Sequence, residues 1–95
     1  HVSASKAGLE GLIRALSREL APHGITCNCV APGAVDTVRG AAAGAKPTNM
    51  SAKDIPVGRV GTVDEIAAMV RHLVGPTGGY ITGQTIHMNG GTFFG

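Results

Sequence analysis

Apolar residues recur at intervals of three and four positions over the first part of the chain. This spacing is that of one stripe along a helix, and Pro22 and Gly24 follow as stop signals. We therefore predict a helix that begins at about Ser3 or Ser5 and ends at about Ala21. The residues of its apolar stripe are Leu9, Leu12, Ile13, Leu16 and Leu20.

Small residues form a second surface on the same predicted helix. They are Ala7, Gly8, Gly11 and Ala15, and we call this surface the small-residue face. A glycine inside a helix costs about 1 kcal/mol relative to alanine. The presence of two glycines therefore indicates a packing role, in which another backbone approaches this face closely.

A second helix is predicted over the stretch TVDEIAAMVRHLV. Thr62 and Glu65 have the spacing of a capping box, in which the two residues satisfy each other's free backbone amides at the helix start. The apolar stripe of this helix comprises Ile66, Met69, Val70 and Leu73. The stretch GPTGG ends it.

Two short apolar runs predict strands. The first, from Ile25 to Ala31, is apolar at nearly every position, as in a strand covered on both faces. The second runs from about Thr85 to Met88. The resulting order is helix, strand, long loop, helix, strand, which is half of an α/β layered unit. Two strands are too few to form a stable sheet alone, so we expect 95 residues to form one compact unit or a piece of a larger one.

The long loop covers residues 33–61, which are rich in Gly, Ala and Pro without a sustained period. We predict a surface excursion with at most a short helical turn. Loops of this length in compact domains usually act as binding loops or lids. Residues 38–53 offer little to bury, so this part is predicted to be the least protected from amide exchange.

Composition narrows the class of protein. The net charge is +2, the basic residues are scattered, and the chain has one Tyr, two Phe and no Trp, which argues against nucleic-acid binding. No apolar run approaches the roughly 20 residues that cross a bilayer, and the chain reads as soluble. Cys27 and Cys29 would share one strand face and cannot easily join each other, so we predict two buried free thiols. The histidines show no metal-ligand spacing, and we predict no metal site.

Three stretches, in order, resemble the C-terminal part of a short-chain dehydrogenase/reductase, close in style to bacterial 3-oxoacyl-acyl-carrier-protein reductases. They are SASKAGLEGLIRALSRELAPHGITCNCVAPGAVDT, PVGRVGTVDEIAAMVRHLV and YITGQTIHMNGG. The resemblance implies the C-terminal portion of a Rossmann-like doubly wound parallel sheet, without its N-terminal dinucleotide-binding half. It implies that residues 1–95 are a partial domain of this family and that residues 33–61 are its substrate- and cofactor-side loop. It also implies a cytoplasmic location.

The family's Tyr-x-x-x-Lys pair is present only in part. Lys6 matches the lysine, which in the family lowers the pKa of the tyrosine and holds the nicotinamide ribose. Val2 occupies the tyrosine position. The resemblance therefore implies a catalytic and cofactor-binding lysine without its general acid/base. Ser3 and Ser5 lie within the motif but do not match the family's catalytic serine.

The resemblance also assigns a cofactor edge after the first strand. Pro32, Gly33, Val35 and Thr37 fall in its Pro-Gly-x-x-x-Thr segment, where the Val35 backbone and the Thr37 hydroxyl would meet the carboxamide of NAD or NADP. A turn after a strand is the simpler interpretation of these residues alone. The glycines of GAAAGAKP do not directly follow a predicted strand, so the sequence offers no Gly-rich cradle for the pyrophosphate.

Two functions follow. The first is the C-terminal part of an NAD(P)-dependent reductase or dehydrogenase for small carbonyl or alcohol substrates, inactive as this chain alone. The alternative is a non-catalytic, self-associating module. We expect a homodimer or tetramer in either case, since uncovered apolar elements mark association surfaces. The small-residue face or residues 66–88 are predicted to lie at that contact.

Four further side chains are assigned structural roles. Tyr80 could replace the missing acid, but it introduces the last strand and is predicted to be packed. His87 is predicted to be a satisfied histidine within that strand. Phe93 and Phe94 lie at the end of the chain, where they would dock on a neighbouring subunit or cover a sheet edge.

Overall fold

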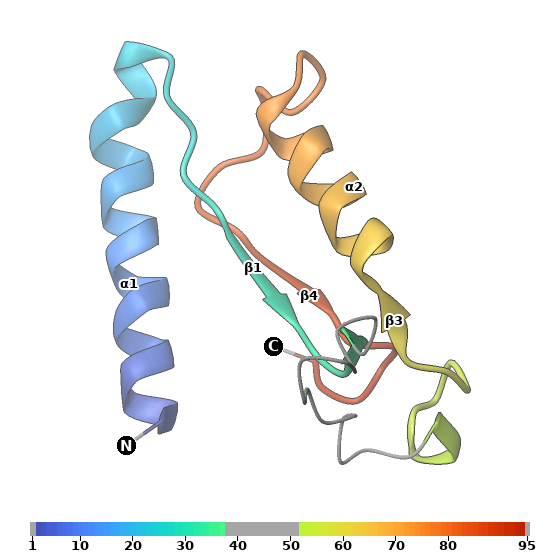
Figure 1. Cartoon of the computed structure of the whole chain (residues 1–95). Helices are drawn as coiled ribbons and strands as arrows, with labels where there is room; N and C mark the ends of the chain where they lie inside the picture. The colour runs from blue at the N-terminus through green and yellow to red at the C-terminus, as the bar shows by residue number, and fades with distance from the viewer. Residues whose placement is uncertain (1, 38–51, 95) are drawn as a thin grey trace. The chain divides into compact units, whose positions relative to one another are not determined.

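The computed structural model describes residues 2–37 and 52–94 (Figure 1). The predicted order of helix, strand, loop, helix and strand is confirmed, and two short strands are added to it. The predicted exchange behaviour of residues 38–53 falls largely outside the described residues. The described elements are α1 (Val2–Leu20), η1 (Ala21–His23), β1 (Cys29–Pro32), β2 (Val35–Asp36), η3 (Ala52–Asp54), β3 (Gly61–Thr62), α2 (Val63–Val74) and β4 (Thr85–Met88).

The chain divides into two compact units. The first comprises His1–Val30 and Arg71–Ile86, and the second comprises Ala31–Val70 and His87–Gly95.

In the first unit, α1 ends where the sequence predicts. The 3-10 turn η1 follows it, and Gly24 adopts a left-handed conformation with φ of 77°. The amide of Gly24 donates to the Ala21 carbonyl at 3.0 Å. This arrangement satisfies a carbonyl that the helix end would otherwise leave without a partner.

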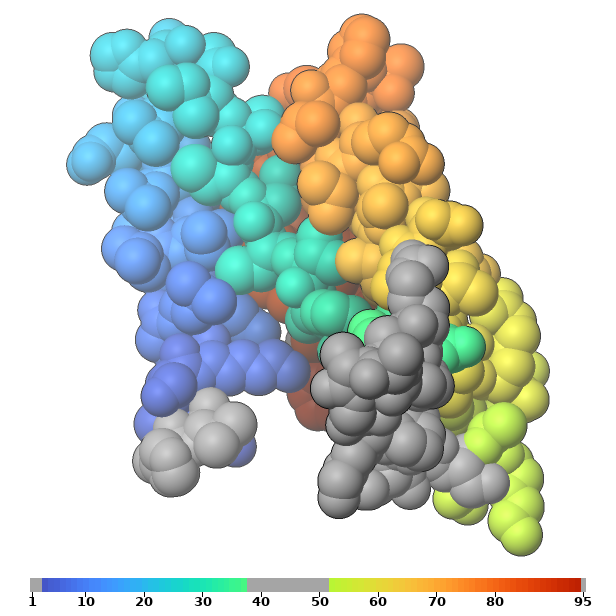
Figure 2. Space-filling model, in the orientation of Figure 1, coloured from blue at the N-terminus to red at the C-terminus, as the bar shows by residue number. Residues whose placement is uncertain are grey.

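Most described residues of α1, which is drawn in blue in Figure 2, are exposed. Leu9 and Leu12 of the predicted apolar stripe are 53% and 54% exposed. Apart from the two chain neighbours and the backbone of the helix itself, no atom of the described residues would lie within 4 Å of a Cβ added at Gly8 or Gly11. The small-residue face is therefore not used for packing by the described residues.

The first strand begins later than predicted, at Cys29 and not at Ile25. Side chains supply part of the pairing before that point. The Cys27 amide donates to Thr82 Oγ1, and the Asn28 side chain donates to the Ile81 carbonyl and accepts from the Gln84 amide, both at 3.0 Å. One backbone hydrogen bond, from the Gly83 amide to the Cys27 carbonyl at 2.7 Å, also precedes the strand, and the bond from the Cys29 amide to the Gln84 carbonyl at 2.8 Å begins it.

The strands pair in parallel, as the predicted fold class requires. Amides of Cys29 and Gly33 donate to carbonyls of Gln84 and Met88, so the pairing of β1 with β4 advances four residues in the same direction on both segments. The bounds of β4 agree with the prediction. Within the second unit, β2 and β3 also pair in parallel, with Val35 opposite Gly61 and Asp36 opposite Thr62.

Few described side chains are buried, and two burial predictions were wrong. The buried apolar side chains of the described residues are Ile55, 3% exposed, and Leu73, 8% exposed. Tyr80, predicted to pack, is fully exposed at 101%, because it lies in the turn between Gly79 and the segment that leads to β4. Cys27 and Cys29 are free thiols, as predicted, but they are half-buried.

Within the described ranges, no helix has the length and apolar character needed to cross a membrane.

Candidate functional site

Lys6 lies in the second turn of α1, in the first unit, and its side chain is exposed. Val2 begins the same helix. Residues four apart on a helix are neighbours on its surface, so positions 2 and 6 share one face. This is the spacing of the family's Tyr-x-x-x-Lys pair. In this chain the lysine position is occupied by Lys6, but the tyrosine position is occupied by an apolar residue.

The remaining predicted site residues, Pro32 to Thr37, form a loop in the second unit that we call the 32–37 loop. It begins at the carboxyl end of β1, where the Gly33 amide donates to the Met88 carbonyl at 3.0 Å. The next residue is held as well, because the Gly61 amide donates to the Ala34 carbonyl, also at 3.0 Å. Val35 and Asp36 then pair with β3, while Thr37 remains exposed.

Gly33 lies too close to Asn89 for any larger residue. A Cβ atom at position 33 would lie 2.6 Å from Cβ and 3.0 Å from Cα of Asn89. Sequence reasoning assigned Gly33 to the cofactor edge and did not identify Asn89. The stretch NGG that contains Asn89 is a turn signal, but no spacing rule links it to Gly33.

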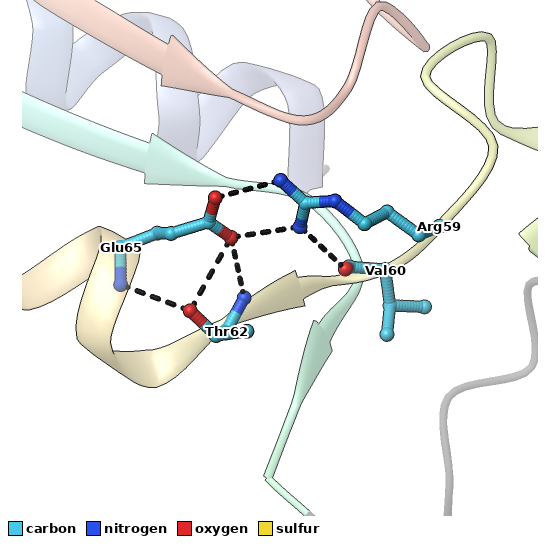
Figure 3. Close-up of polar contacts among 4 residues, drawn as sticks. All are labelled: Arg59, Val60, Thr62 and Glu65. Atoms are coloured by element: carbon cyan, nitrogen blue, oxygen red, sulfur yellow. Dashed lines mark hydrogen bonds and ion pairs between the residues drawn. The ribbon is translucent and has the colours of Figure 1, made fainter.

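A polar network fixes the start of α2 (Figure 3). The predicted capping box is confirmed: the Glu65 amide donates to Thr62 Oγ1 at 3.1 Å, and the Thr62 amide donates to Glu65 Oε1 at 2.9 Å. Arg59, which the sequence reasoning missed, donates through both terminal nitrogens to the Glu65 carboxylate at 2.9 and 2.8 Å. Arg59 also donates to the Val60 carbonyl, so the segment before β3 is tied to the helix.

This network lowers the pKa of Glu65 from 4.5 to about 2. The hydrogen bond from Arg59 is the largest cause, and the backbone hydrogen bond from Thr62 is the next. Both interactions favour the ionised carboxylate. The stability that they provide is therefore fully present above pH 4.5, the ordinary pKa, and is lost as the pH falls through about 2.

We expect Glu65→Gln to lower the thermal unfolding midpoint at neutral pH, by an amount that shrinks as the pH falls from 4.5 toward 2. Glutamine keeps the capping geometry with Thr62 but cannot form the ion pair with Arg59. The measurement is thermal unfolding followed by circular dichroism between pH 7 and pH 2. Asp64→Asn, which removes a carboxylate from the same helical turn, is the control. If the midpoints of the parent and Glu65→Gln differ by the same amount at every pH from 7 to 2, the stabilisation does not come from the ionised Glu65 carboxylate.

The Asn89 side chain forms hydrogen bonds that hold the residues following β4 in place. The Gly91 amide donates to Asn89 Oδ1 and Asn89 Nδ2 donates to the Phe93 carbonyl, both at 3.0 Å. The rings of His87 and Phe93 meet edge to face at 5.1 Å, so Phe93 covers part of the strand within its own unit. Phe94 is exposed.

The predicted site residues therefore belong to two units, Lys6 to the first and the 32–37 loop to the second. Among residues 2–37 and 52–94, no three His, Cys, Asp or Glu side chains are grouped so that they could hold a metal ion. The chemistry that these residues offer is hydrogen bonding: an ammonium donor at Lys6, and backbone and hydroxyl groups at Val35 and Thr37.

Nearly the whole chain matches one protein family. The family described as enoyl-(acyl carrier protein) reductase matches residues 1–92. The chain is 40% identical over 91 residues to the 3-oxoacyl-acyl-carrier-protein reductase FabG of Vibrio cholerae, covering 96% of this chain and 37% of that protein. It is 43% identical over 94 residues to the short-chain reductase NovJ of Streptomyces niveus, covering 92% of this chain and 36% of that protein.

A solved structure agrees with the sequence matches. A double mutant of a Serratia marcescens short-chain dehydrogenase/reductase superposes with a TM-score of 0.77 at 38% identity. The superposition covers 93% of this chain and 36% of that one. The chain thus spans little more than a third of the length of these relatives.

Proposed function

This chain belongs to the short-chain dehydrogenase/reductase family, and we propose that it forms the nicotinamide-side part of an NAD- or NADP-dependent oxidoreductase. Such an enzyme transfers hydride between the nicotinamide and a carbonyl or hydroxyl group of a small substrate. Residues 33–61, of which 33–37 and 52–61 are described, belong in this proposal to the substrate- and cofactor-side loop.

The observation that carries the proposal is the 32–37 loop at the carboxyl end of β1. Ligands of open parallel α/β sheets bind outside the carboxyl ends of the strands. The hydrogen bonds from Gly33 and to Ala34 hold the backbone leading to Val35 in place. A carboxamide needs one donor and one acceptor in fixed register, which the Val35 backbone and the exposed Thr37 hydroxyl supply.

Lys6 holds the ribose in this proposal. Its ammonium group carries three donors and lies on an exposed helix surface. A bound nicotinamide supplies the hydride, and the residues of this chain bind and orient it. Val2 has no proton to give to a reacting oxygen, so the proposal gives the chain a binding role without proton transfer.

The test is a chimera in which this chain replaces the matching part of the Vibrio cholerae reductase. We expect the chimera to bind NADH or NADPH, and Lys6→Ala to weaken that binding at least about tenfold, since hydrogen bonds to charged groups contribute about 1.5–3 kcal/mol. Titration followed by cofactor fluorescence measures this. Arg18→Ala removes another exposed cation from α1 and serves as control. Equal affinities for parent and Lys6→Ala would overturn the assignment of Lys6, and a folded chimera without cofactor binding would overturn the proposed function.

The open surface of α1 favours self-association as a homodimer or tetramer, which we expect both for the oxidoreductase part and for the alternative, a non-catalytic self-associating module. Leu9 and Leu12 are exposed, and the glycines of the small-residue face have free space around them. Large exposed apolar surfaces on soluble proteins mark interaction sites. Self-association is compatible with the oxidoreductase proposal, because an oligomer can carry a cofactor site in each subunit.

We expect Gly11→Leu to shift the chain toward monomer, because a leucine keeps a second backbone from approaching this face. Asp54→Ala, at an exposed position in η3, is the control and leaves association unchanged. Sedimentation equilibrium at tens of micromolar, roughly the range of weak association, measures both. A parent chain that is already a folded monomer under these conditions would refute self-association.

A further inference from the structure

The two described ends of the 33–61 segment meet the same short turn. This turn comprises Asn89, Gly90 and Gly91, and we call it the 89–91 turn. On one side, Gly33 lies against the backbone and Cβ of Asn89, and the Gly33 amide donates to the carbonyl of the preceding Met88. The beginning of the 32–37 loop therefore has little freedom to move relative to the 89–91 turn.

On the other side, the turn holds residues 55–57. The Val57 amide donates to the Gly90 carbonyl at 3.0 Å. A Cβ atom at position 90 would lie 2.5 Å from Cγ2 of Ile55, and Ile55 is buried. Gly90 has a φ of 66°, a conformation that disfavours residues with a side chain. Position 90 thus requires glycine for its backbone angle and for its contact with Ile55.

The turn itself is tied internally. The Asn89 side chain accepts from the Gly91 amide and donates to the Phe93 carbonyl, and the Thr92 amide donates to the Asn89 carbonyl at 3.3 Å. Hydrogen bonds of this kind favour turns at asparagine. The turn is therefore a fixed support against which both ends of the segment pack.

We propose that the 89–91 turn is the positioning element of the 32–37 loop. The turn holds Gly33 and Val57 together and thereby keeps β2 paired with β3. This pairing in turn keeps the Val35 backbone and the Thr37 hydroxyl in the register that a carboxamide needs. The positioning role rests on the proposed function, whereas the packing of both ends on one turn does not. Asn89 and Gly90 act through the loop and do not touch the cofactor.

The first experiment uses the 95-residue chain and needs no cofactor. We expect Gly90→Ala to accelerate amide exchange at Gly61, whose amide joins the two ends of the segment through the Ala34 carbonyl. The matched control is Gly24→Ala, because Gly24 has a similar φ of 77° and no atom within 4 Å of an added Cβ. If Gly90→Ala does not fold, Asn89→Ala, which removes the side-chain hydrogen bonds without adding bulk, takes its place. Unchanged Gly61 exchange in the folded variant would overturn the proposal.

The second experiment uses the chimera. It separates an effect on the position of the 32–37 loop from a loss of structure in the whole dinucleotide site. We expect Gly90→Ala to weaken binding of the dinucleotide about tenfold, the upper range for loss of one neutral hydrogen bond. Binding of the matching ADP-ribose fragment, which lacks nicotinamide, should stay unchanged. Equal loss for both ligands, or no loss for either, would overturn the positioning role. If the parent chimera binds neither ligand, the proposed function and the positioning role fall together, while the Gly61 result still decides the packing.

Discussion

Val2→Tyr is expected to raise the rate of ketone reduction by the chimera about 10²–10⁴-fold, the contribution of a positioned general acid. The residue at position 2 shares a helix face with Lys6, and a tyrosine there would regain the proton donor that valine lacks. Steady-state oxidation of NADH or NADPH with an acetoacetyl substrate measures the rate. The isolated 95-residue chain is expected to show no turnover.

The matched control for this gain is Val2→Phe, which adds the ring without the hydroxyl. It should leave the rate at the level of the parent chimera, because the hydroxyl proton and not the ring volume is required. Lys6→Ala in the Val2→Tyr background should reduce the rate again. A parent chimera that already turns over within about tenfold of the Val2→Tyr chimera would show that position 2 does not supply the missing acid.

Gly78→Ala is expected to destabilise the first unit by about 3 kcal/mol, the upper part of the range for overpacking. A Cβ atom at this position would collide with the carbonyl oxygens of His72 and Leu73 at the end of α2. Both atoms belong to the backbone and cannot rotate away. The unfolding midpoint should fall by more than about 10 °C for a chain of this length.

Gly79→Ala is the control for Gly78→Ala at the next position in the chain. Apart from its two chain neighbours, no described residue has an atom within 4 Å of an added Cβ there, so we expect a change within about 0.5 kcal/mol. Thermal and chemical unfolding of both variants measures the difference. Similar midpoints for the two variants would show that the end of α2 can shift to accept a side chain at position 78.

The features that the sequence predicts well are local ones. Thr62 and Glu65 are three residues apart, and their capping box depends on that spacing alone. The strand from Thr85 to Met88 is bounded by turn residues on both sides. Both elements could be placed because the interactions that define their ends lie within a few residues.

The features that the sequence does not predict depend on residues far apart in the chain. Asn28 replaces part of the expected strand by binding backbone groups near residue 81, which no local pattern indicates. The contact between Gly33 and Asn89 has the same origin. For the candidate site, the pattern identifies Lys6 and the residues of the 32–37 loop, but not the 89–91 turn that packs against the loop.

The hydrogen bonds of Asn28 also bear on how the chain acquires its structure during synthesis. Its two partners follow it by 53 and 56 positions. A ribosome adds roughly 5–20 residues per second, so the segment around Asn28 emerges roughly 3–11 s before Ile81 and Gln84 exist to pair with it. During that interval the Asn28 side chain lacks these partners and the Cys29 amide lacks the Gln84 carbonyl, so the backbone of this segment can pair with strands of other chains. Slower translation of residues 29–84 therefore lengthens the period in which the nascent chain is most exposed to aggregation.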